Sequence, residues 1–317
     1  MDSFIQTHEP VIRLTAFLAI FAAMALWELR APRRVLTVSK PRRWSANLGL
    51  VVLNTLLLRL VFPVAAVGLA ATAASRGWGL FNQVTLPAGV ELGLAIVALD
   101  LVIWAQHVFF HAVPVLWRLH RVHHADLDYD LTTGARFHPI EILLSMLIKF
   151  AAILVLGPSV VAVILFEVIL NAMAMFNHGN VSLPERLERR LRWLLVTPDM
   201  HRVHHSVAAD EANSNFGFNL SLWDRFFGTY RDQPRGGHVG MTLGIDDARD
   251  PRQVSGLLGM LRLPFRGAVT DYAINRRAWK TPELLLQVAP QSRPWRQRWR
   301  WRQAVLATIS WITPYSW

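Results

Sequence analysis

Long apolar runs constrain this sequence more than any other feature, because about 20 apolar residues are what a helix needs to cross a bilayer. Three runs reach that length, at residues 11–29, 47–74 and 86–110. A fourth apolar region, residues 140–176, is interrupted by Gly157 and Pro158 into two halves, each near the minimum for a span. We therefore expect an all-α membrane bundle with about three spans and a helical hairpin, which either crosses twice or re-enters from one side.

The composition agrees with a membrane protein. Of the 317 residues, 53% are hydrophobic and 17% are charged, which is too apolar for a typical soluble enzyme. The run at 11–29 lacks the small-residue cleavage site of a signal peptide, so we expect a retained anchor. The net charge of +11 is typical of chains that meet nucleic acid or anionic lipid, and the hydropathy favours lipid. We expect no nucleic-acid partner.

The orientation follows from the bias of Lys and Arg toward cytoplasmic loops. The segment 30–44 carries six Lys or Arg and no acid, whereas the loop at 75–85 has only Arg76. The first loop is therefore expected in the cytoplasm, and counting crossings from it brings every histidine cluster to that same face. We expect an integral protein of the bacterial inner membrane.

The chain divides by composition into three predicted regions. Residues 1–90 form an N-terminal membrane anchor, residues 91–235 a histidine-rich domain, and residues 236–317 a basic, partly interfacial C-terminal region. In the last region, residues 293–315 alternate Arg and Trp before an apolar stretch. That stretch is either solvated chain or an interfacial helix held by anionic headgroups.

Histidines are concentrated in two places. The pattern His-x-x-x-His at 107–111 is followed by "HRVHH" at 120–124, and "HRVHH" recurs at 201–205. Helical neighbours at i+3 and i+4 share a face, so each box directs two or three imidazoles to one point. Two more histidines, in "RFHPIE" and "FNHGN", fall on the same side of the membrane. The candidate metal ligands are His107, His111, His120, His123, His124, His138, His178, His201, His204 and His205.

The metal that such a set would hold follows from its donors. The chain has no Cys, which excludes thiolate-ligated haem, iron–sulfur clusters and Cys-type zinc sites within it. Imidazoles without carboxylates favour a borderline transition metal over magnesium or calcium. Ten ligands are too many for one ion, so we expect two metals with about five nitrogens each. His8 and His238 lie outside the clusters and are expected to be ordinary surface residues.

The order of these motifs resembles the fatty acid hydroxylase superfamily of membrane di-iron enzymes, also called the sterol desaturase family. The resemblance rests on "WRLHRVHHADLDYDLTTGARFHPIE", "TPDMHRVHHS" and "NSNFGFNLSLWDRFFGTY", and it covers about residues 95–232. It implies a cytoplasmic cap of His-bearing helices on a membrane bundle, with two irons that activate O2 to hydroxylate or desaturate a fatty acyl chain or sterol-like lipid. All ten candidate histidines fit the ligand motifs of the family.

Two acidic residues lie close to these motifs. Thr197 and Pro198 are typical of a helix start, and Asp199 in the first turn either steadies the helix dipole or orients a ligand imidazole as an outer partner. Asp100 shares a helix stripe with His107 but lies about 10 Å from it along the axis. We therefore expect Asp100 to be paired elsewhere in the bundle.

Turnover with O2 needs electrons, and the chain has no Gly-rich nucleotide fingerprint, no Cys and no haem-binding module to deliver them. An external donor is implied, such as a reductase, a ferredoxin or a b-type cytochrome. Zinc could replace iron in a purified sample, because it outcompetes ferrous iron for nitrogen ligands.

Three other functions fit part of the pattern. An ether-lipid monooxygenase of the alkylglycerol type would use the same metal centre. A His-rich metal transporter would place its ligands at mid-membrane, whereas these boxes follow the ends of the spans. A zinc hydrolase needs only three protein ligands, far fewer than this chain offers.

Overall fold

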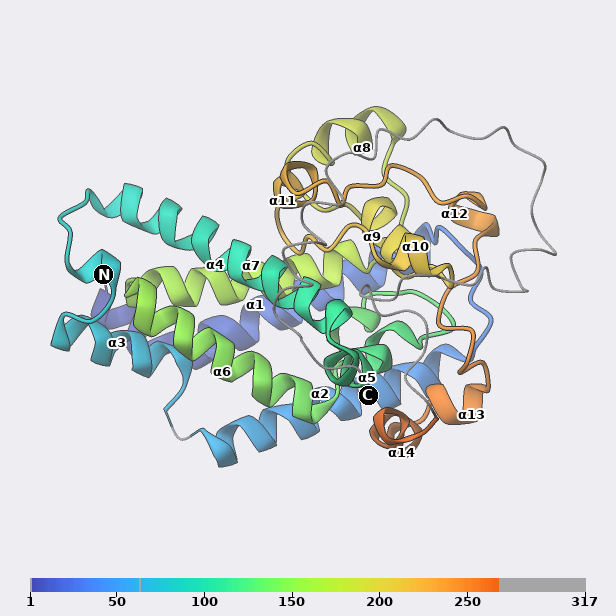
Figure 1. Ribbon diagram of the computed structural model, residues 1–317, viewed down its shortest axis with the longest axis horizontal. Helices are drawn as coiled ribbons and strands as arrows, with labels where there is room; N and C mark the ends of the chain where they lie inside the picture. The colour runs from blue at the N-terminus through green and yellow to red at the C-terminus, as the bar shows by residue number, and fades with distance from the viewer. Residues whose placement is uncertain (1, 63, 268–317) are drawn as a thin grey trace, which may run out of the picture.

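The computed structural model describes residues 2–62 and 64–267, and this part of the chain forms helices and turns with three isolated β-bridges and no strand. The longer helices lie side by side, and the shorter ones gather at one end of the bundle (Figure 1). The all-α prediction is confirmed. The longer helices are α1 (Asp2–Arg30), α2 (Lys40–Val61), α3 (Ala66–Arg76), α4 (Ala88–Ala112), α6 (Pro139–Leu156) and α7 (Val160–Asn177).

The short helices form a cap over one end of this bundle (Figure 1). Between them run loops and the 3-10 turns Leu80–Asn82, Thr133–Ala135 and Leu263–Phe265. The cap helices are α5 (Pro114–His124), α8 (Glu185–Leu191), α9 (Pro198–His204), α10 (Ala209–Ala212), α11 (Leu222–Phe226), α12 (Gly237–Gly240), α13 (Pro251–Val254) and α14 (Leu257–Arg262).

Five helical segments of the described chain are long and apolar enough to cross a membrane, so the protein is an integral membrane protein. The second apolar run is not one helix, because α2 ends at Val61 and α3 begins at Ala66. Pro63 lies between them, and proline cannot continue a helix because it lacks the N–H and its ring clashes with the preceding turn. The five segments are residues 8–30, 40–82, 88–112, 139–156 and 160–177.

The predicted break at residues 157–158 is confirmed. Gly157 ends α6 with φ of 64°, a left-handed conformation that glycine adopts without strain, and its N–H bonds to the carbonyl of Ile153 at 2.8 Å. The hydroxyl of Ser159 then accepts the N–H of Ala162 at 3.2 Å and starts α7. A Cβ at position 157 would lie 2.5 Å from the carbonyl oxygen of Trp78, so this corner packs tightly.

The core of the cap joins parts of the chain that are far apart in sequence. Trp117 and Val122 of α5 are fully buried against Leu50 of α2 and against Met260 and Leu263 near the C-terminal limit of the described residues. Burying each such side chain stabilises the fold by about 1.5–3 kcal/mol. The "HRVHH" box at 120–124, which lies on α5, is therefore held from both sides, by α2 and by residues 254–263.

A buried ionic network connects α2 to the loop that follows α5. The guanidinium of Arg43 bonds the carboxylate of Asp126 at 2.7 and 2.9 Å and that of Asp130 at 2.6 Å, with all three side chains buried. Burial alone would raise the pKa of Asp126, but Arg43 and Arg136 lower it to about 2. This network fixes the loop between α5, which carries the "HRVHH" box at 120–124, and α6. Residues 293–315, the predicted interfacial tail, lie outside the described residues.

Candidate metal centre

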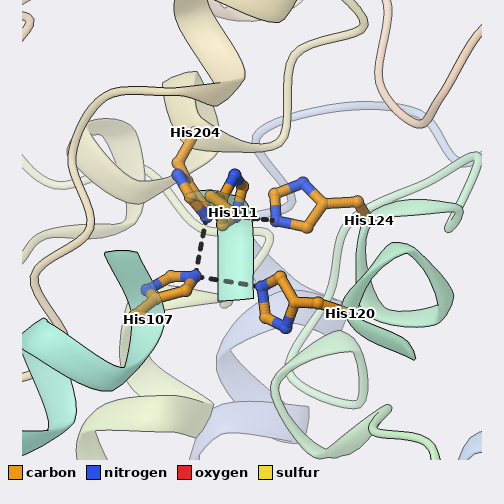
Figure 2. A group of neighbouring side chains, drawn as sticks. All are labelled: His107, His111, His120, His124 and His204. Atoms are coloured by element: carbon orange, nitrogen blue, oxygen red, sulfur yellow. Dashed lines mark hydrogen bonds between the residues drawn. The ribbon is translucent and has the colours of Figure 1, made fainter. Parts of the chain in front are cut away.

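Nine of the ten predicted ligands meet in two buried groups where the cap joins the bundle. Within each group, one ligand atom of every residue lies within 4.8 Å of the others. The first group, shown in Figure 2, has five imidazoles turned toward one another. It contains His107, His111, His120, His124 and His204, and the second group contains His123, His178, His201 and His205.

The helices explain how the histidine boxes are divided. His120 and His124, four residues apart on α5, share a face and enter the first group, whereas His123 points to the second. The box on α9 divides in the same way, since His204 belongs to the first group and His201 to the second. Each "HRVHH" box therefore contributes to both groups, which places the two groups next to each other.

The protonation of His107 and His204 is fixed by backbone carbonyls. Nδ1 of His107 lies 2.8 Å from the carbonyl oxygen of Phe216, and Nδ1 of His204 lies 2.7 Å from that of Ser214. A carbonyl only accepts, so each Nδ1 carries a proton and each Nε2 presents a lone pair. These two Nε2 atoms lie 3.0 Å apart (Figure 2). Two lone pairs so close repel unless a cation binds both, which indicates a metal site.

His178 shows the same arrangement in the second group. Its Nδ1 lies 2.8 Å from the carbonyl oxygen of Ala174 and must donate, so its Nε2 lone pair faces Nε2 of His123 at 3.2 Å. Both nitrogens of His201 and Nε2 of His205 are buried and have no hydrogen-bond partner among the described residues. Buried nitrogens without partners are rare in folded proteins, and a bound metal would satisfy these.

Side-chain oxygens orient two more ligands. Nδ1 of His120 lies 2.6 Å from Oε1 of Glu141, and Nδ1 of His111 lies 3.2 Å from Oδ1 of Asn213. Such partners fix the ring and direct Nε2 to the metal. Neither was predicted from the sequence. Glu141 follows His138 within "HPIE", and its position three residues into an apolar helix was the available signal.

Burial keeps the imidazoles neutral. Desolvation lowers the pKa of His120 and of His178 from 6.5 to about 3. It also lowers the pKa of the other cap ligands, namely His123, His124, His201, His204 and His205, well below 6.5. Neutral imidazole is the form that binds metal, so these groups are ready to ligate at neutral pH. Five and four nitrogens without a carboxylate fit two borderline transition-metal ions.

The tenth candidate, His138, is not part of either group. It is the N-cap of α6, where its Nδ1 accepts the N–H of Ile140 at 3.2 Å, and its Nε2 lies 3.3 Å from the carbonyl oxygen of Leu261. Both ring nitrogens are thus engaged by the backbone. The signal for this role was the His-Pro pair directly before an apolar helix, since proline favours the first helical position.

Asp199 does not contact a ligand imidazole among the described residues. Thr197 caps α9 as predicted, and Asp199 in its first turn pairs with Arg202 and, at 3.1 Å, with Arg33. His238 lies 3.6 Å from Asp199 and is buried, so the expectation that it is a surface residue is wrong. Asp199 therefore connects α9 to the segment after α1, and Glu141 orients a ligand instead.

Another carboxylate, Asp224, shapes the loop that holds His107. It accepts the backbone N–H groups of Phe216 at 2.8 Å and Gly217 at 2.7 Å, and the indole N–H of Trp104 at 3.1 Å. The carbonyl of Phe216 is thereby placed against Nδ1 of His107. Asp224 therefore acts on the site through this loop. The role could not be predicted from the sequence, because the contacts between α4 and this loop join residues more than 100 positions apart.

Asp100 is paired away from His107, as predicted, but its partners belong to the cap and not to the bundle. Its Oδ2 accepts the indole N–H of Trp223 at 2.8 Å and the backbone N–H of Leu220 at 3.2 Å. It therefore anchors the segment before α11 to α4 and leaves His107 to its carbonyl partner.

A cavity of about 340 Å³ leads from the first histidine group into the bundle. His107, His120 and Glu141 line its inner end, and it extends between α1, α2, α4, α6 and α7. Much of its wall is apolar, including Phe17, Ile103, Phe110, Leu170, Met175 and Phe218. A pocket of this size between membrane helices can admit part of a lipid.

The sequence comparisons agree with this site. Residues 92–229 match the family model described as fatty acid hydroxylase, which confirms the predicted resemblance over the region that holds both histidine groups. An ornithine lipid hydroxylase, OlsE, of Rhizobium tropici is 28% identical over 227 residues, which are 71% of this chain and 64% of that protein.

Alkylglycerol monooxygenases match a shorter part. The protein from Xenopus tropicalis is 29% identical over 160 residues, 48% of this chain and 34% of the relative. The human protein is 29% identical over 145 residues, 44% of this chain and 30% of the relative. The chain thus spans between about one third and about two thirds of the length of these curated relatives. No solved structure matches the chain.

Proposed function

Because residues 92–229 match the fatty acid hydroxylase family, we propose that this protein is a membrane-bound di-iron oxygenase that hydroxylates a lipid with O2. The observation that carries the proposal is the pair of imidazole groups, the first of which lines a cavity between membrane helices through His107 and His120. A lipid in that cavity would bring its carbon chain to the first group without leaving the bundle.

The nine histidines of the two groups are the proposed ligands, with His138 left out. Two irons bound there would supply O2 activation and the oxidation of an unactivated C–H bond. Burial keeps the imidazoles neutral. Glu141, Asn213 and the carbonyls of Phe216, Ser214 and Ala174 orient their rings. It also buries the site, which keeps water from the reacting carbon. Zinc would bind the same ligands in an iron-poor preparation.

The relatives support two classes of substrate. The name of the Rhizobium tropici relative favours hydroxylation of a lipid, and the names of the others favour oxidation of an ether lipid. Lipid hydroxylation is the first proposal because that relative matches the larger share of this chain. Oxidation of an alkylglycerol-type ether lipid is the second. Metal transport is disfavoured, because both groups lie at the ends of the spans and not halfway along them.

The cellular setting is also part of the proposal. The basic segment 30–44 supports an orientation in which the cap faces the cytoplasm, on the inner membrane of a bacterium. An external reductase, ferredoxin or b-type cytochrome would deliver electrons there. Residues 91–235 would form the catalytic domain, with residues 1–90 as the anchor and 236–317 as a supporting region. The packing of α2 and residues 254–263 against α5 supports these roles for the regions on either side of the catalytic domain.

The test is a comparison of lipid extracts from cells with and without the protein, by mass spectrometry. A lipid that gains one oxygen means hydroxylation, a loss of two hydrogens means desaturation, and a released aldehyde means ether cleavage. Full activity with zinc as the only metal would contradict the oxygenase proposal.

A further inference from the structure

Three charged side chains that line the cavity meet away from the histidines. Nζ of Lys149 on α6 lies 2.5 Å from Oε1 of Glu167 on α7, and Nη1 of Arg13 on α1 lies 2.9 Å from Oε2 of the same carboxylate. All three residues line the cavity, and the side chain of Glu167 is 4% exposed. Three helices thus contribute to one charged cluster, the Arg13–Lys149–Glu167 cluster.

This cluster lies deep in the membrane region. Lys149 is ten residues into α6 from Pro139, and Glu167 is ten residues before the end of α7 at Asn177. At 1.5 Å per residue, both lie about 15 Å from the cap end of their helices, about half the thickness of the hydrocarbon core. Charged side chains at that depth are costly and commonly mark a functional site.

Polar side chains connect the cluster to the metal centre. Glu141, Ser145 and Lys149 follow each other at four-residue spacing on α6, so they form one stripe, and all three line the cavity. Gln106 of α4 donates to the hydroxyl of Ser145 at 2.9 Å and lines the cavity too. A lipid that entered only with its hydrocarbon end would offer these polar groups no hydrogen-bond partner.

The cations of the cluster have more donors than the carboxylate can accept. Lys149 has three N–H donors and Arg13 has five. Among the described residues, Lys149 makes one contact through Nζ, to Glu167, and Arg13 makes its contacts through Nη1 alone. Glu9 pairs with Arg13 through that same Nη1. Donors therefore remain for an acceptor inside the cavity, and a purely structural ion pair would not need to face it.

We propose that Arg13 and Lys149, held in place by Glu167, bind an oxygen-bearing polar group of the lipid substrate, such as an ester, hydroxyl or carboxylate. The inference rests on the proposed function, since it concerns the substrate of that site. Lys149 lies eight residues, or about 12 Å of helix, from Glu141 at the metal centre. The subsite therefore sets the distance between the polar group and the carbon that is oxidised.

Binding of matched probes to the full-length protein in detergent tests this without turnover. The probes are tritiated palmitic acid, hexadecan-1-ol, 1-O-hexadecylglycerol and hexadecane, which share one chain length and differ in the polar group. At least one oxygen-bearing probe should bind about tenfold or more tighter than hexadecane, as expected for a hydrogen bond to a charged group. Lys149→Met should remove that preference, and Lys149→Arg should retain it.

The control is Arg59→Met, which removes an exposed cation of α2 outside the cavity. It should bind every probe as the wild type does. The double variant Lys149→Met with Glu167→Met leaves no charge of that pair unpaired, and it replaces the single variant if Lys149→Met fails to fold. An unchanged preference in a folded double variant, or equal binding of hexadecane and all oxygen-bearing probes to the wild type, would overturn the subsite.

This result is separable from the proposed function. If the wild type oxidises no lipid when loaded with iron but Lys149→Met still loses its preference among the probes, the oxygenase proposal fails and the subsite stands. If the wild type hydroxylates a lipid and Lys149→Met makes the same product with the same KM, the subsite fails and the oxygenase stands. The subsite predicts a raised KM or a shifted position of the new oxygen.

Discussion

Oε1 of Glu141 lies 2.6 Å from Nδ1 of His120, and this contact joins the cavity between the membrane helices to the first histidine group. The carboxylate belongs to the first turn of α6, a helix that otherwise consists mainly of apolar residues. When ionised, this carboxylate accepts a hydrogen bond from Nδ1–H of His120, which directs the Nε2 lone pair into the first histidine group. One residue of a membrane helix thus orients a ligand supplied by the cap.

Replacing Glu141 by Ala is expected to weaken metal binding at the first group by about 10–100-fold, the usual effect of removing such an outer partner. Glu141→Gln keeps a carbonyl oxygen that can accept from Nδ1, so it should lose less. Competitive titration of the purified protein with a chromophoric chelator measures the affinity. Ser145→Ala, one turn further along α6, is the matched control and should bind metal normally. Equal affinity of Glu141→Ala and wild type would exclude the orienting role.

One substitution in each group should remove one metal. His204→Ala takes a nitrogen from the first group and His123→Ala one from the second, so each variant should retain about one iron per chain and lose turnover. Elemental analysis of the iron-loaded protein counts the ions. His138→Ala is the control, because that residue caps α6 and should leave both irons bound. Loss of an iron in His138→Ala would restore it to the ligand set.

Arg43→Met should destabilise the fold, because it leaves the buried carboxylate of Asp130 without its paired cation and that of Asp126 with Arg136 alone, at 3.8 Å. Breaking a buried ion pair on one side costs about 3–5 kcal/mol. The midpoint of thermal unfolding in detergent is the measurement. Arg42→Met removes a neighbouring charge that is exposed, and it should leave the midpoint almost unchanged. Similar midpoints for the two variants would show that the network contributes little.

Acid should destabilise the metal-free protein over a defined range. Burial lowers the pKa of His120 and His178 from 6.5 to about 3, so between these values the unfolded chain binds more protons than the folded one. The contribution of these two neutral histidines to the free energy of unfolding is therefore complete above pH 6.5 and is lost as the pH falls toward 3. The midpoint of thermal unfolding should be equal at pH 8 and 6.5 and should fall at pH 5 and again at pH 4. A midpoint that stays constant between pH 6.5 and 4 would contradict this expectation.

Bound metal should shift that profile. Protons compete with metal for the imidazoles. Saturating metal should therefore raise the unfolding midpoint most above pH 6.5, and the metal should be released as the pH falls. Metal content after dialysis at each pH, measured on the wild type, gives the release curve. Metal retained in full at pH 4 would conflict with imidazole ligation.

Eight of the nine histidines in the two groups could be predicted to cluster because their spacing is local: i+3 and i+4 neighbours on a helix share a face whatever the rest of the fold does. How they divide between two groups was not predicted, because His123 and His178 come together only through the packing of α5 against the end of α7. His138 was grouped with them by its place on the same membrane face, but it lies outside both groups, where the backbone of α6 and of Leu261 engages its nitrogens.

The outer partners needed the folded structure. Glu141 and Asn213 are separated from their histidines by 21 and 102 residues, and Asp224 acts through a carbonyl. The spans were predicted by length and composition, apart from the division of the second run at Pro63. Arg13 was visible in the first run, but its meeting with Glu167 depends on how α1 packs against α7.

The most direct test of the account is the source of the oxygen in the product. Iron-loaded protein with an artificial reductant and a lipid extract under ¹⁸O2 should yield a lipid that has gained one ¹⁸O atom, and His204→Ala should yield none. A protein that holds two irons, receives electrons and still leaves every lipid without ¹⁸O would contradict the proposal that this chain is an O2-dependent lipid hydroxylase.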